Sequence, residues 1–206
     1  MRLDQKIIHH LILQYPFIED IGLFYGKMGV AIFFYEYSAY VRNKIYSDIG
    51  YELLSDIWNN LSIRHPFYFD SGLCGIGWGI EYLIQNKFIV GDSNDICEEI
   101  DRQIMQINLH RLDDKSIDTG LDGILYYVSS RLRGNKCQKT EISFDSDFIE
   151  MCFGKMTLVE IGIKYPVDLY QFINNNISVK EDCVQDYKLG LKDGVSGFLL
   201  NDIRRV

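Results

Sequence analysis

Apolar residues along this chain follow two patterns, and the first is a single stripe with the period of a helix. Between residues 48 and 61 the stripe residues recur every four positions: Ile49, Leu53, Ile57 and Leu61. Residues 94–109 repeat this arrangement with Ile96, Ile100, Ile104 and Ile107, and their expected wet face carries Glu98, Glu99 and Asp101. Residues 1–14 and 146–162 are similar. This spacing predicts amphipathic helices with one face in the core.

The second pattern is apolar on every side of a helix. Residues 30–35 and 124–128 show it most clearly. A helix that is apolar all round is a buried helix, so these segments are expected to lie inside. Alternation of apolar and polar residues with a period of two is not sustained in the sequence, so no strand is predicted. The fold class is therefore all-α, with α/α-hairpin repeats of apolar inner helices and amphipathic outer helices.

A glycine phrase opens the predicted inner helices. It begins with Gly-Leu at four places: Gly22, Gly72, Gly120 and Gly190. The later glycines of the phrases are Gly26, Gly29, Gly75, Gly123, Gly194 and Gly197. Repetition at such intervals is typical of one supersecondary unit used several times. Glycine here permits a tight turn and a close approach of backbones, so a structural role is expected. A phosphate-binding loop is disfavoured, because no strand precedes these glycines.

The C-terminal third contains two expected breaks. Gly134–Thr140 is polar and predicts a loop, with Gly134 and Asn135 ending a helix. Pro166 interrupts the last interval between phrases, and residues 168–176 predict a short additional helix. Composition does not change along the chain as it does at a linker, so residues 1–206 are expected to form one domain of about four helical hairpins.

Charge and composition narrow the classes of partner and compartment. The formal net charge is −8, and no segment is rich in Lys and Arg, which disfavours nucleic acid and anionic membranes as partners. No run of about eighteen apolar residues predicts a membrane span. The 5 cysteines have no framework spacing, and the first residues lack a signal-peptide pattern, so we expect a reduced, cytoplasmic protein.

The repeated Gly-Leu-x-x-Gly phrases, each opening an inner helix, resemble those of the lanthionine synthetase C-like (LanC-like) cyclases. The resemblance covers all four phrases. It implies an α/α toroid, which would here be partial or shortened, because the family's toroid has seven hairpins. Catalytic LanC-like members hold zinc through one Cys and a neighbouring Cys-His pair. That zinc activates a substrate thiol, which then adds to a dehydrated residue of a bacterial precursor peptide.

The chain departs from this ligand pattern. Gly72-Leu73-Cys74-Gly75 keeps the cysteine of the family's Gly-Leu-Cys-His-Gly phrase, but the histidine is missing and no Cys-His pair occurs elsewhere. One thiolate cannot hold a catalytic zinc, which needs three protein ligands. A site made of Cys74, His65 and His110 is the zinc alternative; packing of Cys74 as a small apolar residue is the other interpretation. No cofactor is therefore expected.

Acidic and aromatic residues near the phrases are further candidates for ligand binding. The carboxylates are Asp70, Asp118, Asp122 and Asp193. They have a structural alternative, because carboxylates stabilise helix N-termini. Asp70 and Asp122 would be the acid and base if the chain were a toroidal carbohydrate hydrolase. Trp78 is a candidate ligand contact, and Glu81 is a lone charge in an apolar helix, which is either paired or functional.

Taken together, these features favour a non-catalytic LanC-like accessory protein that binds a peptide or a partner enzyme in bacterial peptide maturation. The alternatives are a zinc-dependent cyclase with unusual ligands and the carbohydrate hydrolase. The shortage of hairpins relative to a full toroid also predicts that the exposed flanks are covered by a partner protein, by a second copy of the chain or by the additional helix near Pro166.

Overall fold

The protein is described by a computed structural model that covers residues 2–173 and 178–204. These residues form helices joined by loops and contain no strand, so the all-α prediction is confirmed. They divide into two compact units. The first unit is Met1–Leu61 with Asp168–Val206, and the second unit is Ser62–Val167. None of the helices in the described ranges combines the length and apolar character needed to cross a lipid bilayer.

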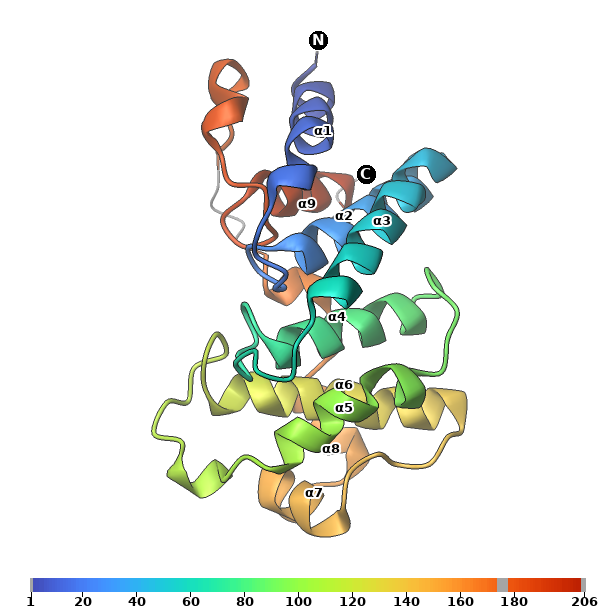
Figure 1. The fold of residues 1–206 in the computed structure, drawn as a ribbon, viewed down its shortest axis with the longest axis vertical. Coiled ribbons are helices and arrows are strands. Elements are labelled where there is room, and N and C mark those ends of the chain that lie inside the picture. The colour runs from blue at the N-terminus through green and yellow to red at the C-terminus, as the bar shows by residue number, and fades with distance from the viewer. Residues whose placement is uncertain (1, 174–177, 205–206) are drawn as a thin grey trace. The chain divides into compact units, whose positions relative to one another are not determined.

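The first unit is built around one apolar helix, α2 (Lys27–Val41), whose residues are buried from Lys27 to Tyr35. Helix α3 (Lys44–Asn60) forms a hairpin with α2, and its Asn43 cap accepts a hydrogen bond from the Ile45 amide. Two further helices complete the unit: α1 (Leu3–Gln14) and α9 (Val195–Arg204). Helix α9 packs against α2, so the last helix of the chain contacts the first inner one (Figure 1).

The second unit has a pair of inner helices, α4 (Leu73–Gln85) and α6 (Leu121–Gln138), which lie side by side (Figure 1). Every residue of α4 from Leu73 to Ile84 is buried. The amphipathic helix α5 (Ser93–Met105) packs against both. Helices α7 (Ser146–Phe153) and α8 (Leu158–Lys164) follow. The described residues also include short 3-10 segments: Tyr15–Phe17, Leu109–Arg111, Leu169–Gln171 and Glu181–Asp186.

Four predicted element boundaries differ from the structure. The helix predicted over 94–109 ends at Met105, so Ile107 of the predicted stripe lies outside it. Gly134–Thr140 is not a loop, because α6 continues to Gln138 and ends where Lys139 adopts a left-handed φ of 59°. The predicted helix over 146–162 is two helices, because Gly154, with φ of 61°, ends α7 and Thr157 caps α8. Of the helix expected over 168–176, only a 3-10 turn at Leu169–Gln171 forms; residues 174–176 lie outside the described residues.

Candidate functional site

The four glycine phrases are each closed by the same backbone hydrogen bond. In each, the amide of the residue that begins the helix donates to the carbonyl oxygen of the residue seven positions earlier. The four bonds join Lys27 to Asp20 (2.8 Å), Leu73 to Pro66 (2.9 Å), Leu121 to Asp114 (2.9 Å) and Val195 to Lys188 (2.8 Å). This bond satisfies one of the free amides that every helix N-terminus presents. The prediction that each phrase opens a helix is confirmed.

The loops also correct the alignment of the phrases. The equivalent glycines are those immediately before the helices: Gly26, Gly72, Gly120 and Gly194. A Cβ at any of them would lie too close to the carbonyl oxygen six residues earlier. The same holds one turn later at Gly29, Gly123 and Gly197. Gly22 and Gly190 lie four residues before the equivalent position, so they do not correspond to Gly72 and Gly120. Aligning the four phrases by their Gly-Leu pairs therefore gave the wrong correspondence between their glycines.

Within each unit, two of these loops are joined by backbone hydrogen bonds. In the second unit the amides of Phe69 and Asp70 both donate to the Asp118 carbonyl oxygen, at 2.8 and 3.0 Å. In the first unit the Lys192 amide donates to the Phe24 carbonyl oxygen at 3.0 Å. The loops that open neighbouring inner helices therefore meet at the same end of the pair.

This pairing gathers some of the predicted acidic residues. Asp70, Asp118 and Asp122 all belong to the joined loops of the second unit or the first turn of α6, and all three are half-buried. The Asp70 carboxylate accepts a hydrogen bond from the Ser71 hydroxyl at 2.7 Å. Asp193 belongs to the first unit, where it adopts a left-handed φ of 56° in the last loop. A carboxylate in the first turn of α6 also stabilises the helix N-terminus, as the structural interpretation of Asp122 requires.

The other candidates on α4 belong to the core. Cys74, Trp78 and Glu81 are each 0% exposed, so none of them presents surface to a ligand. Burial raises the pKa of the Cys74 thiol well above its ordinary value, which keeps the thiol protonated. The Trp78 ring stacks on Tyr82, with ring centroids 5.4 Å apart. Cys74 and Trp78 thus pack as apolar core residues, and Glu81 needs a buried partner.

The structure does not group Cys74, His65 and His110 into a site that could hold zinc. The His65 ring lies beside Ser62, with 2.9 Å between Nδ1 and the Ser62 carbonyl oxygen. His110 is exposed in the 3-10 turn at Leu109–Arg111. Across the described part of the chain, no three His, Cys, Asp or Glu side chains are grouped so that they could hold one metal ion. The buried Cys74 therefore lacks the histidine partners that this alternative requires.

Glu81 is instead part of a buried charge network centred on Arg131. The Arg131 side chain is 0% exposed, and its guanidinium Nη2 lies 2.7 Å from Asp101 Oδ2. The guanidinium also donates to Glu81, Ser93, Asn94 and Ser143. The Glu81 carboxylate fills the space that a side chain at Gly134 would occupy. This contact explains why Gly134, which was predicted to end a helix, lies inside α6. The network joins α4, α5 and α6.

Protonation within this network follows from burial and pairing. Burial alone would lower the pKa of Arg131, but the hydrogen bonds to Asp101 raise it above its ordinary value, so the guanidinium stays charged. The Tyr127 hydroxyl donates to Asp101. Burial and the nearby Cys97 and Asp101 raise the pKa of Tyr127 well above its ordinary value. The charged centre of the network, Arg131 with Glu81 and Asp101, is thus closed to solvent, while Asn94 and Ser143 at its edge are half-buried.

Asp101 was expected on the wet face of its helix, and that expectation is wrong: it is 2% exposed. The burial of Asp101 could have been predicted from its position in the helix. It lies four residues after the buried Cys97 and three before the buried Ile104, so it shares their face. The same is true of Arg131, which lies four residues after Tyr127 on an inner helix. A charge that occupies the apolar stripe of a helix predicts a buried partner.

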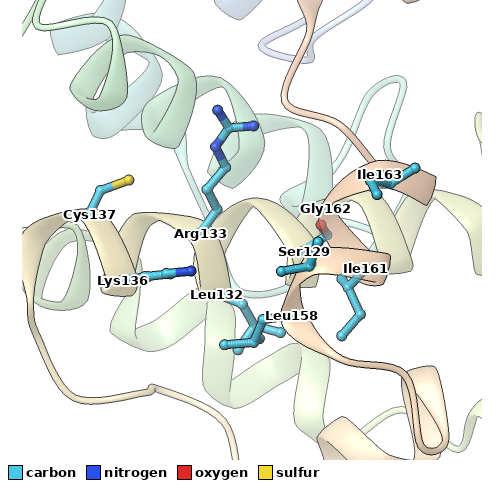
Figure 2. Close-up of a pocket in the computed structure, with 10 residues that line it drawn as sticks. Ser129, Leu132, Arg133, Lys136, Cys137, Leu158, Ile161, Gly162 and Ile163 are labelled. Atoms are coloured by element: carbon cyan, nitrogen blue, oxygen red, sulfur yellow. The ribbon is translucent and has the colours of Figure 1, made fainter.

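A surface pocket of about 430 Å³ lies between α6 and α8. Figure 2 shows its lining residues, with Arg133 and Lys136 projecting from α6. Helix α6 contributes Ser129, Leu132, Arg133, Lys136 and Cys137, and α8 contributes Leu158, Val159, Ile161, Gly162 and Ile163. We call this pocket the α6–α8 groove. None of its residues was a candidate from the sequence, because α6 and α8 come together only in the folded unit.

Comparison of the chain with protein families, with curated proteins and with solved structures found no match. The kinship with LanC-like proteins therefore stays a prediction that depends on the glycine phrases.

Proposed function

We propose that this chain is a LanC-like accessory protein that binds a peptide, or a peptide-modifying partner enzyme, without performing zinc chemistry. The bacterial and cytoplasmic setting belongs to the same proposal and comes from the family resemblance. The shared loop at the head of α2, α4, α6 and α9 supports the hairpin-array part of it. Such arrays present extended surfaces and are widely used for binding.

The observation that carries the non-catalytic part is the position of Cys74. It occupies the cysteine place of the zinc phrase, yet it is 0% exposed and burial raises the pKa of its thiol. A cysteine binds a catalytic zinc as a thiolate and needs two further protein ligands beside it, and the described residues provide no such group. This combination favours binding over thiol activation.

A thiol-addition assay tests the absence of zinc chemistry. The probe is a synthetic peptide that carries one cysteine and one dehydroalanine, incubated with the protein with and without added zinc. We expect the free thiol to disappear at the rate seen in buffer alone. Zinc-dependent addition that Cys74→Ala abolishes and Cys183→Ala preserves would establish the cyclase alternative instead. Cys183 is partly exposed and belongs to the other compact unit, so it serves as the control.

A selection experiment tests binding itself. A display library of random linear peptides is selected on the immobilised protein, and enriched peptides are measured by fluorescence anisotropy. We expect peptides that bind saturably and compete with one another. If no sequence is enriched, peptide binding by this chain is contradicted.

Hydrolysis of an oligosaccharide from a glycan panel, lost in the double variant Asp70→Asn with Asp122→Asn, would establish the carbohydrate alternative.

A further inference from the structure

We propose that the α6–α8 groove is the binding site, and that its ligand is an acidic peptide segment with large apolar side chains. This inference depends on the proposed function for the premise that the chain binds a peptide. It adds the place of binding and the chemistry of the ligand.

The walls of the groove are apolar and partly uncovered. Leu132 and Ile161 are buried at 4% and 3% exposure, while Leu158, Val159 and Ile163 are 46%, 64% and 75% exposed. Three large aliphatic side chains are therefore uncovered on a helix of 7 residues. Clustered exposed apolar side chains mark interaction sites more often than scattered ones do. The volume lies in the range of ligand pockets, which is about 300–1,000 Å³. Apolar side chains of a ligand would gain free energy by covering these residues.

Gly162 keeps the groove open without any packing reason. Nothing lies within 4 Å of the place where its Cβ would be. A glycine inside a helix costs roughly 0.5–1 kcal/mol relative to alanine, and most helical glycines of this chain offset that cost with a close contact. Gly123, for example, would place a Cβ against the Ile117 carbonyl oxygen. The space at Gly162 is instead left empty, as a ligand side chain requires.

Helix α8 is fixed in place before any ligand arrives. The Ser129 hydroxyl of α6 donates to the Tyr165 carbonyl oxygen at 2.9 Å. The Tyr165 ring packs against Tyr126 and Phe153, with centroids 5.1 and 5.8 Å apart. Thr157 caps the other end of the helix through a capping box with Glu160. A preformed groove binds more tightly, because little conformational entropy is lost on binding.

Two cations select the charge of the ligand. Arg133 and Lys136 are exposed, lie on one face of α6 three residues apart, and belong to the groove lining. Within the described residues neither of them forms an ion pair. The one carboxylate on α8, Glu160, is occupied by the amide and hydroxyl of Thr157. Unpaired cations beside an apolar surface favour a ligand that carries carboxylates and disfavour a basic one.

The test uses the peptides enriched by the display selection, with variants chosen so that folding and binding separate. Gly162→Leu fills the groove from a position with open space and improves helix propensity, so it should fold at least as well as the parent. Arg133→Glu with Lys136→Glu reverses the rim charge. The controls are Asn59→Leu, which places the same apolar side chain at an exposed position of α3 outside the groove lining, and Arg111→Glu with Lys115→Glu, which makes the same charge change at residues that do not line the groove.

We expect the enriched peptides to combine Asp or Glu with Leu, Phe or Ile. Their affinity should fall by about tenfold or more in Gly162→Leu and in the rim reversal, and stay unchanged in both controls. Enriched peptides that ignore both groove variants would overturn the site while peptide binding stands. Basic enriched peptides would overturn the charge argument. A dimer in sedimentation that Gly162→Leu converts to monomer would replace the peptide with a second copy of this chain.

Discussion

Arg131 is the centre of the buried charge network in the second unit. Its charge is buried between Asp101 and Glu81, from α5 and α4, and Tyr127 completes the set of donors to Asp101. A buried ion pair contributes little net stability compared with apolar residues of the same volume. Loss of one partner is different, because it leaves the remaining charges buried without compensation.

Replacing Arg131 by methionine should therefore lower the free energy of unfolding by about 3–5 kcal/mol, since two carboxylates would remain without their cation. Urea unfolding followed by circular dichroism measures this change. Arg133→Met, on the same helix but exposed, is the control and should change the free energy by less than about 0.5 kcal/mol. Equal effects of the two substitutions would contradict a structural role for the network.

We expect Tyr127 to lower the stability of the protein at alkaline pH. Its pKa is raised in the folded state, so the folded protein holds the phenol proton more tightly than the unfolded chain does. The contribution of Tyr127 to the free energy of unfolding is therefore fully present below the ordinary pKa of 10. As pH rises above this value, the free energy of unfolding falls by about 1.4 kcal/mol per pH unit for this one group.

Urea unfolding at a series of pH values above 10 tests this in the parent and in Tyr127→Phe. The variant should lose about 1 kcal/mol at neutral pH, because the hydrogen bond to Asp101 is gone. Its alkaline decline should be shallower than that of the parent. Tyr35, whose pKa burial raises to about 12, contributes equally to both proteins and leaves the difference unaffected. Identical pH slopes would show that Tyr127 ionises freely.

At the scale of elements, the N-terminal glycine loop is the unit that the chain repeats. The residue before each helix must be glycine, because a Cβ there would clash with the carbonyl oxygen six residues earlier. The amide of the first helical residue donates a hydrogen bond to the carbonyl oxygen seven residues earlier. Both interactions involve backbone carbonyl groups and do not depend on which side chains the loop carries. Loops with sequences as different as Phe69-Asp70-Ser71 and Leu191-Lys192-Asp193 therefore share this closing hydrogen bond, although Asp193 has a left-handed φ and Ser71 does not.

Alanine at Gly72 tests this requirement against alanine at Gly162. The Gly72→Ala side chain would overlap the Pro66 carbonyl oxygen, and we expect a loss of about 1–3 kcal/mol in the free energy of unfolding. The Gly162→Ala side chain enters open space on a helix, and a gain of about 0.5–1 kcal/mol is expected. A tolerated Gly72→Ala would mean that the loop has room that this account denies.

The spacing of apolar residues predicted where helices form, but it predicted less well the boundaries that depend on a single residue. Leu53 and Ile57 are buried as their four-residue spacing indicates. Gly134 was predicted to end a helix because glycine usually does so, but the Glu81 carboxylate, distant in sequence, determines its place. The α6–α8 groove was not predictable, because it depends on how Ser129 and Tyr165 join two helices across 36 residues of sequence.

At the scale of the whole molecule, each compact unit contains one pair of glycine-loop helices. The second unit pairs α4 with α6, which are consecutive repeats. The first unit pairs α2 with α9, so the end of the chain returns to its beginning. The repeat itself was predictable from the glycines, whereas this pairing of the first and last copies required coordinates. The toroid suggested by the resemblance remains a prediction.

Hydrogen exchange with and without a selected peptide tests most directly the claim that this is a binding protein whose ligand site is the α6–α8 groove. Amides become protected where a ligand covers or rigidifies the backbone. The account predicts slower exchange on peptide addition in residues 129–137 and 158–164. Protection confined to the glycine loops at residues 66–75 and 114–123 would contradict it.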